Sequence, residues 1–276
     1  MAIAARKAIR RAARLSEPLP SIPGLQRLHD DGVKFRRGQL VMIAGLSNGG
    51  KSMIAEWMAS EMNVPTLYFS ADQDEWTTMT RLVASQTGAS AASVSREMHL
   101  DPHHYDDLLS GSQITFSFDS NPSVEDIGEE VDAFVELWDE WPELIIVDNL
   151  VNIEGSGEHE VDQWIMGELH NLARTTKACV IVLAHLSEVS TPKPTRPGRK
   201  KDIINKLSKF PELILTVAYD PYENTMYVAK VKSRESKADP LADMPYALGA
   251  DMGSCQFFAQ PTPAWGYGNY YDQEAS

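Results

Sequence analysis

The stretch that decides the fold is Gly45-Leu46-Ser47-Asn48-Gly49-Gly50-Lys51-Ser52. An apolar run at residues 40–44 precedes it and predicts a buried strand, and residues 53–59 after it predict a helix. A glycine-rich loop between a strand and a helix is the context in which backbone N–H groups and a helix N-terminus bind phosphate. A glycine-rich turn without a ligand is the plainer interpretation, and the flanking pattern disfavours it.

This loop predicts a nucleoside triphosphate as ligand. We expect Lys51 to reach the β- and γ-phosphates and Ser52 to hold Mg²⁺. The loop residues expected to contact the nucleotide are Gly45, Ser47, Asn48, Gly49, Gly50, Lys51 and Ser52.

Length and composition limit what the rest of the chain can be. The 276 residues, 43% of them hydrophobic, suit one large domain or a core with short extensions. A formal net charge of −14 means that any nucleic-acid contact must come from a local basic patch. The two cysteines, Cys179 and Cys255, are too few for a four-cysteine zinc module and fit a reducing cytoplasm. No apolar run reaches the length of a membrane span, so we expect no membrane partner.

Three regions are expected along the chain. Residues 1–23 form a basic arm followed by a proline-rich linker. The arm, which has no acidic residue in positions 1–14, favours docking or nucleic-acid binding; a targeting peptide and a solvated tail are the alternatives. Residues 24–260 form the core. Residues 261–276, rich in Gly, Tyr and Trp, are expected to be a disordered or interaction tail.

Chemically useful side chains follow three predicted strands, at residues 65–70, 144–147 and 178–184. Asp72, Asp148 and His185 stand at or just after the ends of these strands. Because the carboxyl ends of parallel strands meet at one edge of a sheet, we expect all three side chains near the loop. Asp148 is expected to be the second Mg²⁺ anchor. For His185, sensing of the γ-phosphate and a purely structural role both remain open.

The remaining helices and strands are also predicted from the sequence, and one of the helices is strongly acidic. Helices are predicted at residues 76–86, 123–138 and 161–176, and strands at 113–116, 213–217 and 226–231. The second helix and its flanks hold ten acidic residues between positions 119 and 143 with no basic one, which predicts a solvated face.

A basic segment lies between positions 188 and 201. It is predicted to contact nucleic-acid phosphates, and a mobile solvent loop is the plainer interpretation. Its basic residues are Lys193, Arg196, Arg199, Lys200 and Lys201. Two more cations, Lys232 and Arg234, follow the strand predicted at residues 226–231, and their side chains point the same way. They either serve a functional site or protect an exposed sheet edge.

In order and spacing, these segments resemble the RecA-like ATPase domain of DnaB-type hexameric replicative helicases, and phage primase–helicases in particular, over about residues 24–258. The segments that carry the resemblance are Gly45–Ser52, Tyr68–Asp72, Arg81–Ala84, Ile145–Leu150, Val182–Leu186 and Lys232–Arg234. The resemblance implies a P-loop NTPase with a mostly parallel, twisted central sheet and helices on both faces.

The resemblance also assigns roles to single residues. Asp148 matches the acid that anchors Mg²⁺, His185 the γ-phosphate sensor, and Arg81 a nucleotide-contacting position. Arg234 matches an arginine finger given to a neighbouring subunit's ATP, and Lys232 is its companion.

The catalytic base is where the sequence departs from the family. Asp72 stands where such helicases usually have the glutamate that polarises water, so the base is left open between Asp72, Asp74 and Glu75. The plainer interpretation of this acidic run is a capped helix start, which fits Asp74 or Glu75 better than Asp72.

We therefore expect an ATP- and Mg²⁺-dependent DNA helicase that forms a homo-oligomer, a hexameric ring, with ATP between subunits. It would move along single-stranded DNA during phage replication in the bacterial host cytoplasm, with primase or other replisome proteins as further partners. We expect neither a primase module, because its zinc-binding cysteines are missing, nor an N-terminal helical domain, and we expect the basic arm to stand in for a linker helix. The alternatives are a RecA/RadA-like recombinase filament and a weakly hydrolysing ATP-binding loader or adaptor.

Overall fold

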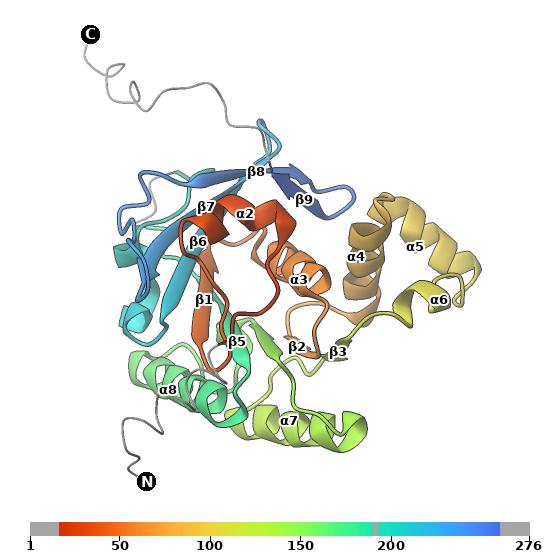
Figure 1. Ribbon diagram of the computed structural model, residues 1–276, viewed down its shortest axis with the longest axis horizontal. Helices are drawn as coiled ribbons and strands as arrows, with labels where there is room; N and C mark the ends of the chain where they lie inside the picture. Colours follow the sequence, from red (N-terminus) through yellow and green to blue (C-terminus); the bar gives the residue numbers. More distant parts are fainter. Residues whose placement is uncertain (1–16, 190–192, 260–276) are drawn as a thin grey trace.

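The computed structural model describes residues 17–189 and 193–259. Their fold is built on a nine-stranded sheet with the order β3-β2-β4-β5-β1-β6-β7-β8-β9 (Figure 1). The strands are β1 (Leu40–Gly45), β2 (Thr66–Ser70), β3 (Ile114–Ser117), β4 (Leu144–Asp148), β5 (Cys179–His185), β6 (Leu213–Asp220), β7 (Thr225–Ser233), β8 (Tyr246–Asp251) and β9 (Gln256–Ala259).

The sheet has a parallel and an antiparallel part. From β3 to β6 every neighbouring pair is parallel, whereas β7, β8 and β9 are added antiparallel. β1, β2 and β4 are buried along their whole length, which explains why their sequences are almost continuously apolar. This confirms the predicted α/β class and its mostly parallel sheet.

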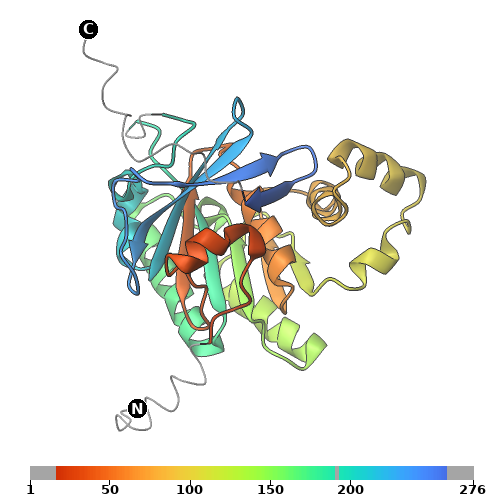
Figure 2. The same cartoon turned by 45° about the horizontal axis from the view of Figure 1, so that its top comes forward.

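Helices cover both faces of the sheet (Figures 1 and 2). The longer helices are α3 (Lys51–Met62), α4 (Glu75–Thr87), α5 (Ala91–Leu100), α7 (Val124–Trp138) and α8 (His159–Thr176). The shorter ones are η1 (Pro23–Leu25), α2 (Gln26–Asp30), α6 (Asp106–Leu109), η2 (Leu150–Asn152), η3 (Lys200–Asp202) and η4 (Ile204–Lys209). Among the described residues, none of these helices combines the length and the apolar character needed to cross a membrane.

Two apolar layers pack against the sheet, one on each face. Ile54 and Met58 of α3 belong to one layer, together with Leu28 of α2. Val131 of α7 and Leu169 of α8 belong to the other. Helices α4, α5 and α6 connect β2 to β3 and stand to one side of the sheet (Figure 2). This arrangement leaves the edge of the sheet at the carboxyl end of β1 for the glycine-rich loop.

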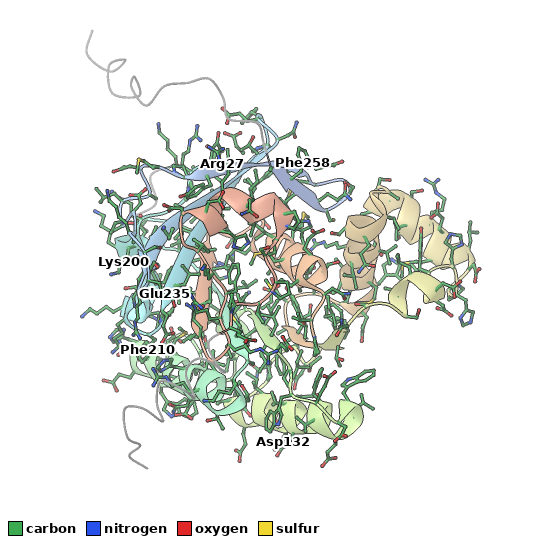
Figure 3. All side chains as sticks on the ribbon, viewed as in Figure 1. Arg27, Asp132, Lys200, Phe210, Glu235 and Phe258 are labelled. Carbon is green, nitrogen blue, oxygen red and sulfur yellow. The ribbon has the colours of Figure 1, made fainter. Side chains whose placement is uncertain are left out.

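Most predicted elements are confirmed, including the helix expected at residues 123–138, which starts with a capping box formed by Ser123 and Asp126. The acidic face of α7 is exposed as predicted, with Asp132 pointing outward (Figure 3). Two features differ. β8 was not expected, and the packed core begins earlier than residue 24, because Leu19 and Ile22 of the expected linker are buried. The predicted basic arm at residues 1–14 and the tail at 261–276 lie outside the described residues.

Candidate nucleotide-binding site

The site lies where the carboxyl ends of β1, β2, β4 and β5 meet. In the sheet register Gly45 pairs with His185, and Ser70 pairs with Asp148. The chain enters the glycine-rich loop from Gly45 and leaves it into α3 at Lys51. The register therefore brings the loop and the predicted strand-end residues to one edge, as the sequence indicated.

Two glycines explain the shape of the loop. Gly50 caps α3 with a left-handed backbone, φ 81°, and a Cβ there would lie 2.5 Å from the Cε of Met226. A Cβ at Gly45 would lie 2.9 Å from the carbonyl oxygen of Val217. The backbone can therefore pack tightly against β6 and β7 while the first N–H groups of α3 stay available for an anion.

Lys51 is held inside the loop. Its Nζ donates to the carbonyl oxygen of Leu46 at 2.9 Å and lies 3.5 Å from Nδ1 of His185. Burial lowers the pKa of Lys51, while the charges of Asp148 and Asp72 oppose that shift. A buried ammonium that is bonded to a neutral oxygen is positioned to bind an anionic ligand.

Asp148 is a buried carboxylate at the end of β4. Its Oδ2 accepts a hydrogen bond from the Tyr68 hydroxyl at 3.0 Å. Its Oδ1 is buried and has no hydrogen-bond partner within the described residues. Burial raises the pKa of Asp148, and the bonds from Ser52 and Tyr68 and the charge of Lys51 oppose this. An orphaned carboxylate oxygen beside a serine hydroxyl fits Mg²⁺, which takes few protein oxygens and prefers carboxylates.

Asp72 and His185 complete the cluster. The exposed Asp72 affects the pKa values of Lys51, Asp148 and His185, so its charge acts on the whole site. Nδ1 of His185 lies 3.5 Å from the hydroxyl of Ser47. Burial and the Lys51 charge lower the pKa of His185, so its ring is neutral at neutral pH.

The neighbouring acids behave as a helix start. Asp74 is the N-cap of α4, and its Oδ1 accepts the backbone N–H of Thr77 at 2.7 Å. Glu75 follows in the first turn and is exposed. This arrangement favours Asp72 among the three candidate bases, and its catalytic role stays a prediction.

Sequence reasoning missed two buried polar residues beneath the site, Tyr68 and Glu56. Glu56 lies one helical turn after Ser52, is only 4% exposed, and neither of its carboxylate oxygens has a partner within the described chain. Burial raises the pKa of Glu56 to about 8, with Arg81 opposing and Asp148 adding to the shift. The only signal in the sequence was the i, i+4 spacing from Ser52, which puts both side chains on one helix face. Arg81 itself donates to the side chain of Gln73.

Lys232 and Arg234 are not part of this cluster. The Nη1 of Arg234 lies 3.1 Å from Oε1 of Glu212, and Oε2 of Glu212 accepts the backbone N–H of Leu40, the first residue of β1. The loop begins at the other end of that strand, at Gly45. Arg234 and the loop therefore lie at opposite edges of the sheet: the loop is where the parallel strands end, and Arg234 is where they begin.

The surroundings of Lys232 are also formed by its own chain. Its Nζ donates to the carbonyl oxygens of Ser208 and Lys209 at 2.7 and 3.1 Å. Burial lowers the pKa of Lys232 to about 8, and repulsion from Arg234 adds to the shift.

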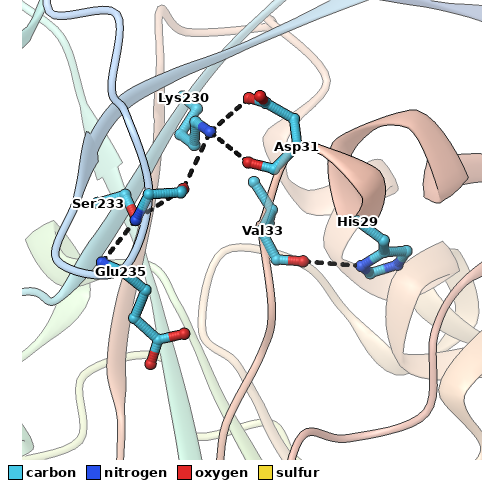
Figure 4. A network of polar contacts seen from close by, with 7 residues as sticks. His29, Asp31, Val33, Lys230, Ser233 and Glu235 are labelled. Carbon is cyan, nitrogen blue, oxygen red and sulfur yellow. Dashed lines mark hydrogen bonds and ion pairs between the residues drawn. The ribbon is translucent and has the colours of Figure 1, made fainter.

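A polar network fixes β7 just before these two cations (Figure 4). The buried Lys230 donates to the backbone and side-chain oxygens of Asp31 at the end of α2, and to the hydroxyl of Ser236 at 3.0 Å. Ser236 in turn bonds to Ser233, which also accepts the backbone N–H of Glu235 at 3.2 Å. The segment that carries Lys232 and Arg234 is therefore tied to the core.

The basic segment leaves the site directly after His185. Its two arginines are engaged within the chain, because Arg199 forms an ion pair with the buried Asp202 and Arg196 lies 4.2 Å from the ring centroid of Tyr227. Lys193 and Lys201 are exposed, and Lys200 is partly exposed and labelled in Figure 3.

A mostly parallel sheet with this loop, a buried acid at the end of β4 and a histidine at the end of β5 defines a RecA-like P-loop nucleoside triphosphatase. Residues 23–203 match the family described as DnaB-like helicase C terminal domain. The chain belongs to this family and is a helicase ATPase. Among curated proteins it is 32% identical over 258 residues to the Gene 65 protein of Mycobacterium phage L5, covering 87% of this chain and 90% of that protein. It is also 31% identical over 218 residues to the Gene 65 protein of Mycobacterium phage D29, covering 73% and 90%.

Solved structures agree on the fold. One of them, described as an ATPase domain, superposes with a TM-score of 0.76 at 17% identity, covering 93% of this chain and 97% of that one. A DnaB-like replicative helicase, described with its interactions with primase, superposes with a TM-score of 0.75 at 16% identity. That match covers 93% of this chain and 66% of the helicase.

Proposed function

We propose that this protein hydrolyses Mg²⁺-bound ATP at the interface between copies of itself and uses the energy to move along single-stranded DNA during phage replication. The observation that carries the proposal is the division of the predicted residues between two edges of the sheet. Lys51, Asp148 and His185 meet at one edge, whereas Arg234 lies at the other. A ring of subunits, with six as the expected number, would join the two edges.

Within one subunit the roles follow from the contacts. Lys51 would bind the phosphates, and Ser52 and Asp148 would hold Mg²⁺, which neutralises charge on phosphate oxygens. Asp72 is exposed and acts electrostatically on all of these groups, so it would orient the attacking water and accept its proton.

The neighbouring subunit would supply Arg234 to the phosphates, with Lys232 beside it. A guanidinium placed there would stabilise the charge that develops during phosphoryl transfer. Its present partner is Glu212, and the arginine of this ion pair is half exposed. Glu212 also contacts His170 and accepts the backbone N–H of Leu40, so its carboxylate has partners without Arg234. Exchanging that partner for a phosphate is therefore energetically accessible.

The DNA contact would come from the basic segment, through Lys193, Lys200 and Lys201. Arg196 and Arg199 contact Tyr227 and Asp202, which supports a shaped loop that presents the lysines. The segment follows His185, whose ring lies within 3.5 Å of Lys51, so the same short stretch would sense the γ-phosphate and contact DNA.

The direct test is ATP hydrolysis with and without single-stranded DNA, for the wild type and Lys51→Ala. We expect DNA to stimulate the wild type and Lys51→Ala to be inactive. ATP hydrolysis that DNA does not stimulate, together with no DNA binding at low salt, would contradict the proposal of a DNA motor.

Asp72 keeps one alternative open. Its side chain is one methylene shorter than the glutamate expected at that position, and a loader or adaptor that binds ATP but barely hydrolyses it would tolerate the change. Single-turnover hydrolysis decides, because efficient turnover excludes the alternative. Electron microscopy with single-stranded DNA and a nonhydrolysable ATP analogue separates a closed ring from a recombinase-like filament.

The mycobacteriophage relatives support phage DNA replication as the process in which this protein acts. The motor would work in the host cytoplasm with primase or other replisome proteins as partners.

A further inference from the structure

Tyr68 lies inside the sheet, directly beneath the site. It belongs to β2, where it pairs with Ile146 of β4, and it is fully buried. Its ring packs against that of Phe116 on β3, with ring centroids 5.3 Å apart. The phenol is therefore fixed in position by both neighbouring strands, and its hydroxyl has little freedom to choose a partner.

The partner is the predicted Mg²⁺ anchor. The Tyr68 hydroxyl donates to Oδ2 of Asp148 at 3.0 Å, while Oδ1 of the same carboxylate is buried without a partner within the described residues. The two oxygens are thus made different by one hydrogen bond. One is satisfied by the phenol, and the other is left for a cation or for its bound water.

The phenol is a permanent donor. Burial raises the pKa of Tyr68 well above its usual value of 10, and the charges of Asp148 and Glu56 add to the shift. The hydroxyl keeps its proton throughout the physiological range. A buried tyrosine hydroxyl needs a hydrogen-bond partner, and here the partner is the predicted Mg²⁺ anchor.

We propose that Tyr68 is a positioning residue that orients the Asp148 carboxylate for Mg²⁺, an inference that rests on the proposed function as a Mg²⁺-dependent ATPase. The hydrogen bond fixes the rotation of the carboxylate about its terminal torsion, which is otherwise broad. Groups that hold a metal ligand in this way typically change metal affinity or activity about 10- to 100-fold when they are removed.

The competing explanation is that Tyr68 is only a core aromatic. In that case its ring matters and its hydroxyl does not. Tyr68→Phe separates the two, because it keeps the ring against Phe116 and removes only the donor.

The experiment measures binding of a fluorescent ATP analogue as a function of Mg²⁺ concentration, and also without Mg²⁺. We expect Tyr68→Phe to raise the Mg²⁺ concentration for half-maximal binding about 10-fold, with Mg²⁺-free binding unchanged. The matched control is Tyr105→Phe, which removes another hydroxyl–carboxylate bond, to Glu97, in the α4–α6 part of the chain. The control should behave like the wild type.

Two further variants make the result decisive. Tyr68→p-aminophenylalanine keeps a donor at the same place and should restore the Mg²⁺ dependence, even if Tyr68→Phe folds poorly. In an Asp148→Asn background, Tyr68→Phe should add no further change. A Tyr68→Phe protein with wild-type Mg²⁺ dependence overturns the inference. A wild type whose nucleotide binding ignores Mg²⁺ would instead overturn the proposed function.

Discussion

The two edges of the central sheet hold their charged groups in different ways. At the edge of the loop, Lys51 and Asp148 are buried, and one oxygen of Asp148 has no hydrogen-bond partner among residues 17–189 and 193–259. At the opposite edge, Lys232 and Arg234 use their donors on backbone carbonyls and on Glu212 of the same chain. The first edge is prepared for a ligand by burial. The second would need an exchange of partners before its cations could serve the neighbouring subunit of the proposed ring.

The largest effect should come from removing Lys51. Lys51→Ala removes the one charged side chain of residues 45–52, and we expect ATP hydrolysis to become undetectable, because phosphate binding and charge stabilisation are lost together. Nucleotide binding, followed by fluorescence, should weaken in parallel. The exposed Lys34 provides the matched control, since Lys34→Ala leaves the site intact. Hydrolysis by Lys51→Ala at the level of Lys34→Ala would remove the loop from the mechanism.

Arg234→Ala tests the opposite edge. We expect hydrolysis to fall about 1,000-fold, the size typical of a lost arginine finger, while nucleotide binding changes little. Mixing Arg234→Ala with Lys51→Ala should recover activity, because an intact loop on one protein meets an intact Arg234 on the other.

The exposed Arg174 offers a matched control for that experiment, since Arg174→Ala should stay active alone. Two inactive variants that remain inactive when mixed, in an assembly shown to exchange subunits, would place Arg234 outside any shared site.

Glu56 provides a prediction on stability. Its pKa is about 8 in the folded protein against 4.5 for an ordinary glutamate, so the folded state binds the extra proton and stability falls as pH rises from about 4.5 to 8. Glu56→Gln should remove this loss and raise the free energy of unfolding at pH 8, relative to pH 5, by on the order of a few kcal/mol. Urea unfolding at both pH values measures it.

The matched control for Glu56 is Glu61→Gln, on the exposed face of the same helix, which should show no such dependence. A Glu56→Gln effect of equal size at pH 5 and pH 8 would mean that Glu56 is already ionised in the fold.

The smallest effect concerns the basic segment. Lys201→Ala removes one exposed cation, and binding to single-stranded DNA should weaken a few-fold with a salt dependence reduced by about one unit or less in slope. Titrations at several salt concentrations measure the slope. Lys34→Ala again serves as control, and an identical slope for both variants would separate the segment from DNA.

Much of the fold could be predicted because the parallel strands carry their signal locally. β1 and β4 are buried on both faces, so their apolar runs need no knowledge of their neighbours. β8 has no such signal, since its sequence includes Ala247, Gly249 and Ala250. It is a strand because it pairs with β7 and β9, and Gly249 is needed there because a Cβ would overlap the ring of Phe258.

The site divides in the same way. The loop, Asp148 and His185 could be predicted because they stand at strand ends, and the structure brings them together. Tyr68 and Glu56 stand inside a strand and a helix, where a sequence reader takes them for packing. Tyr68 is distinguished by its bond to an oxygen 80 residues away and Glu56 by its burial, and residue spacing reveals neither.

Strand β7 runs between the two edges compared above. Met226, near its start, packs against Gly50 of the loop, and Arg234 follows directly after its last residue. β7 is hydrogen-bonded to β6 along its length and to β8 at its beginning. A ribbon bonded in this way resists sliding and stretching. In the proposed ring, β7 would therefore hold a subunit's own loop and its Arg234 at a fixed separation.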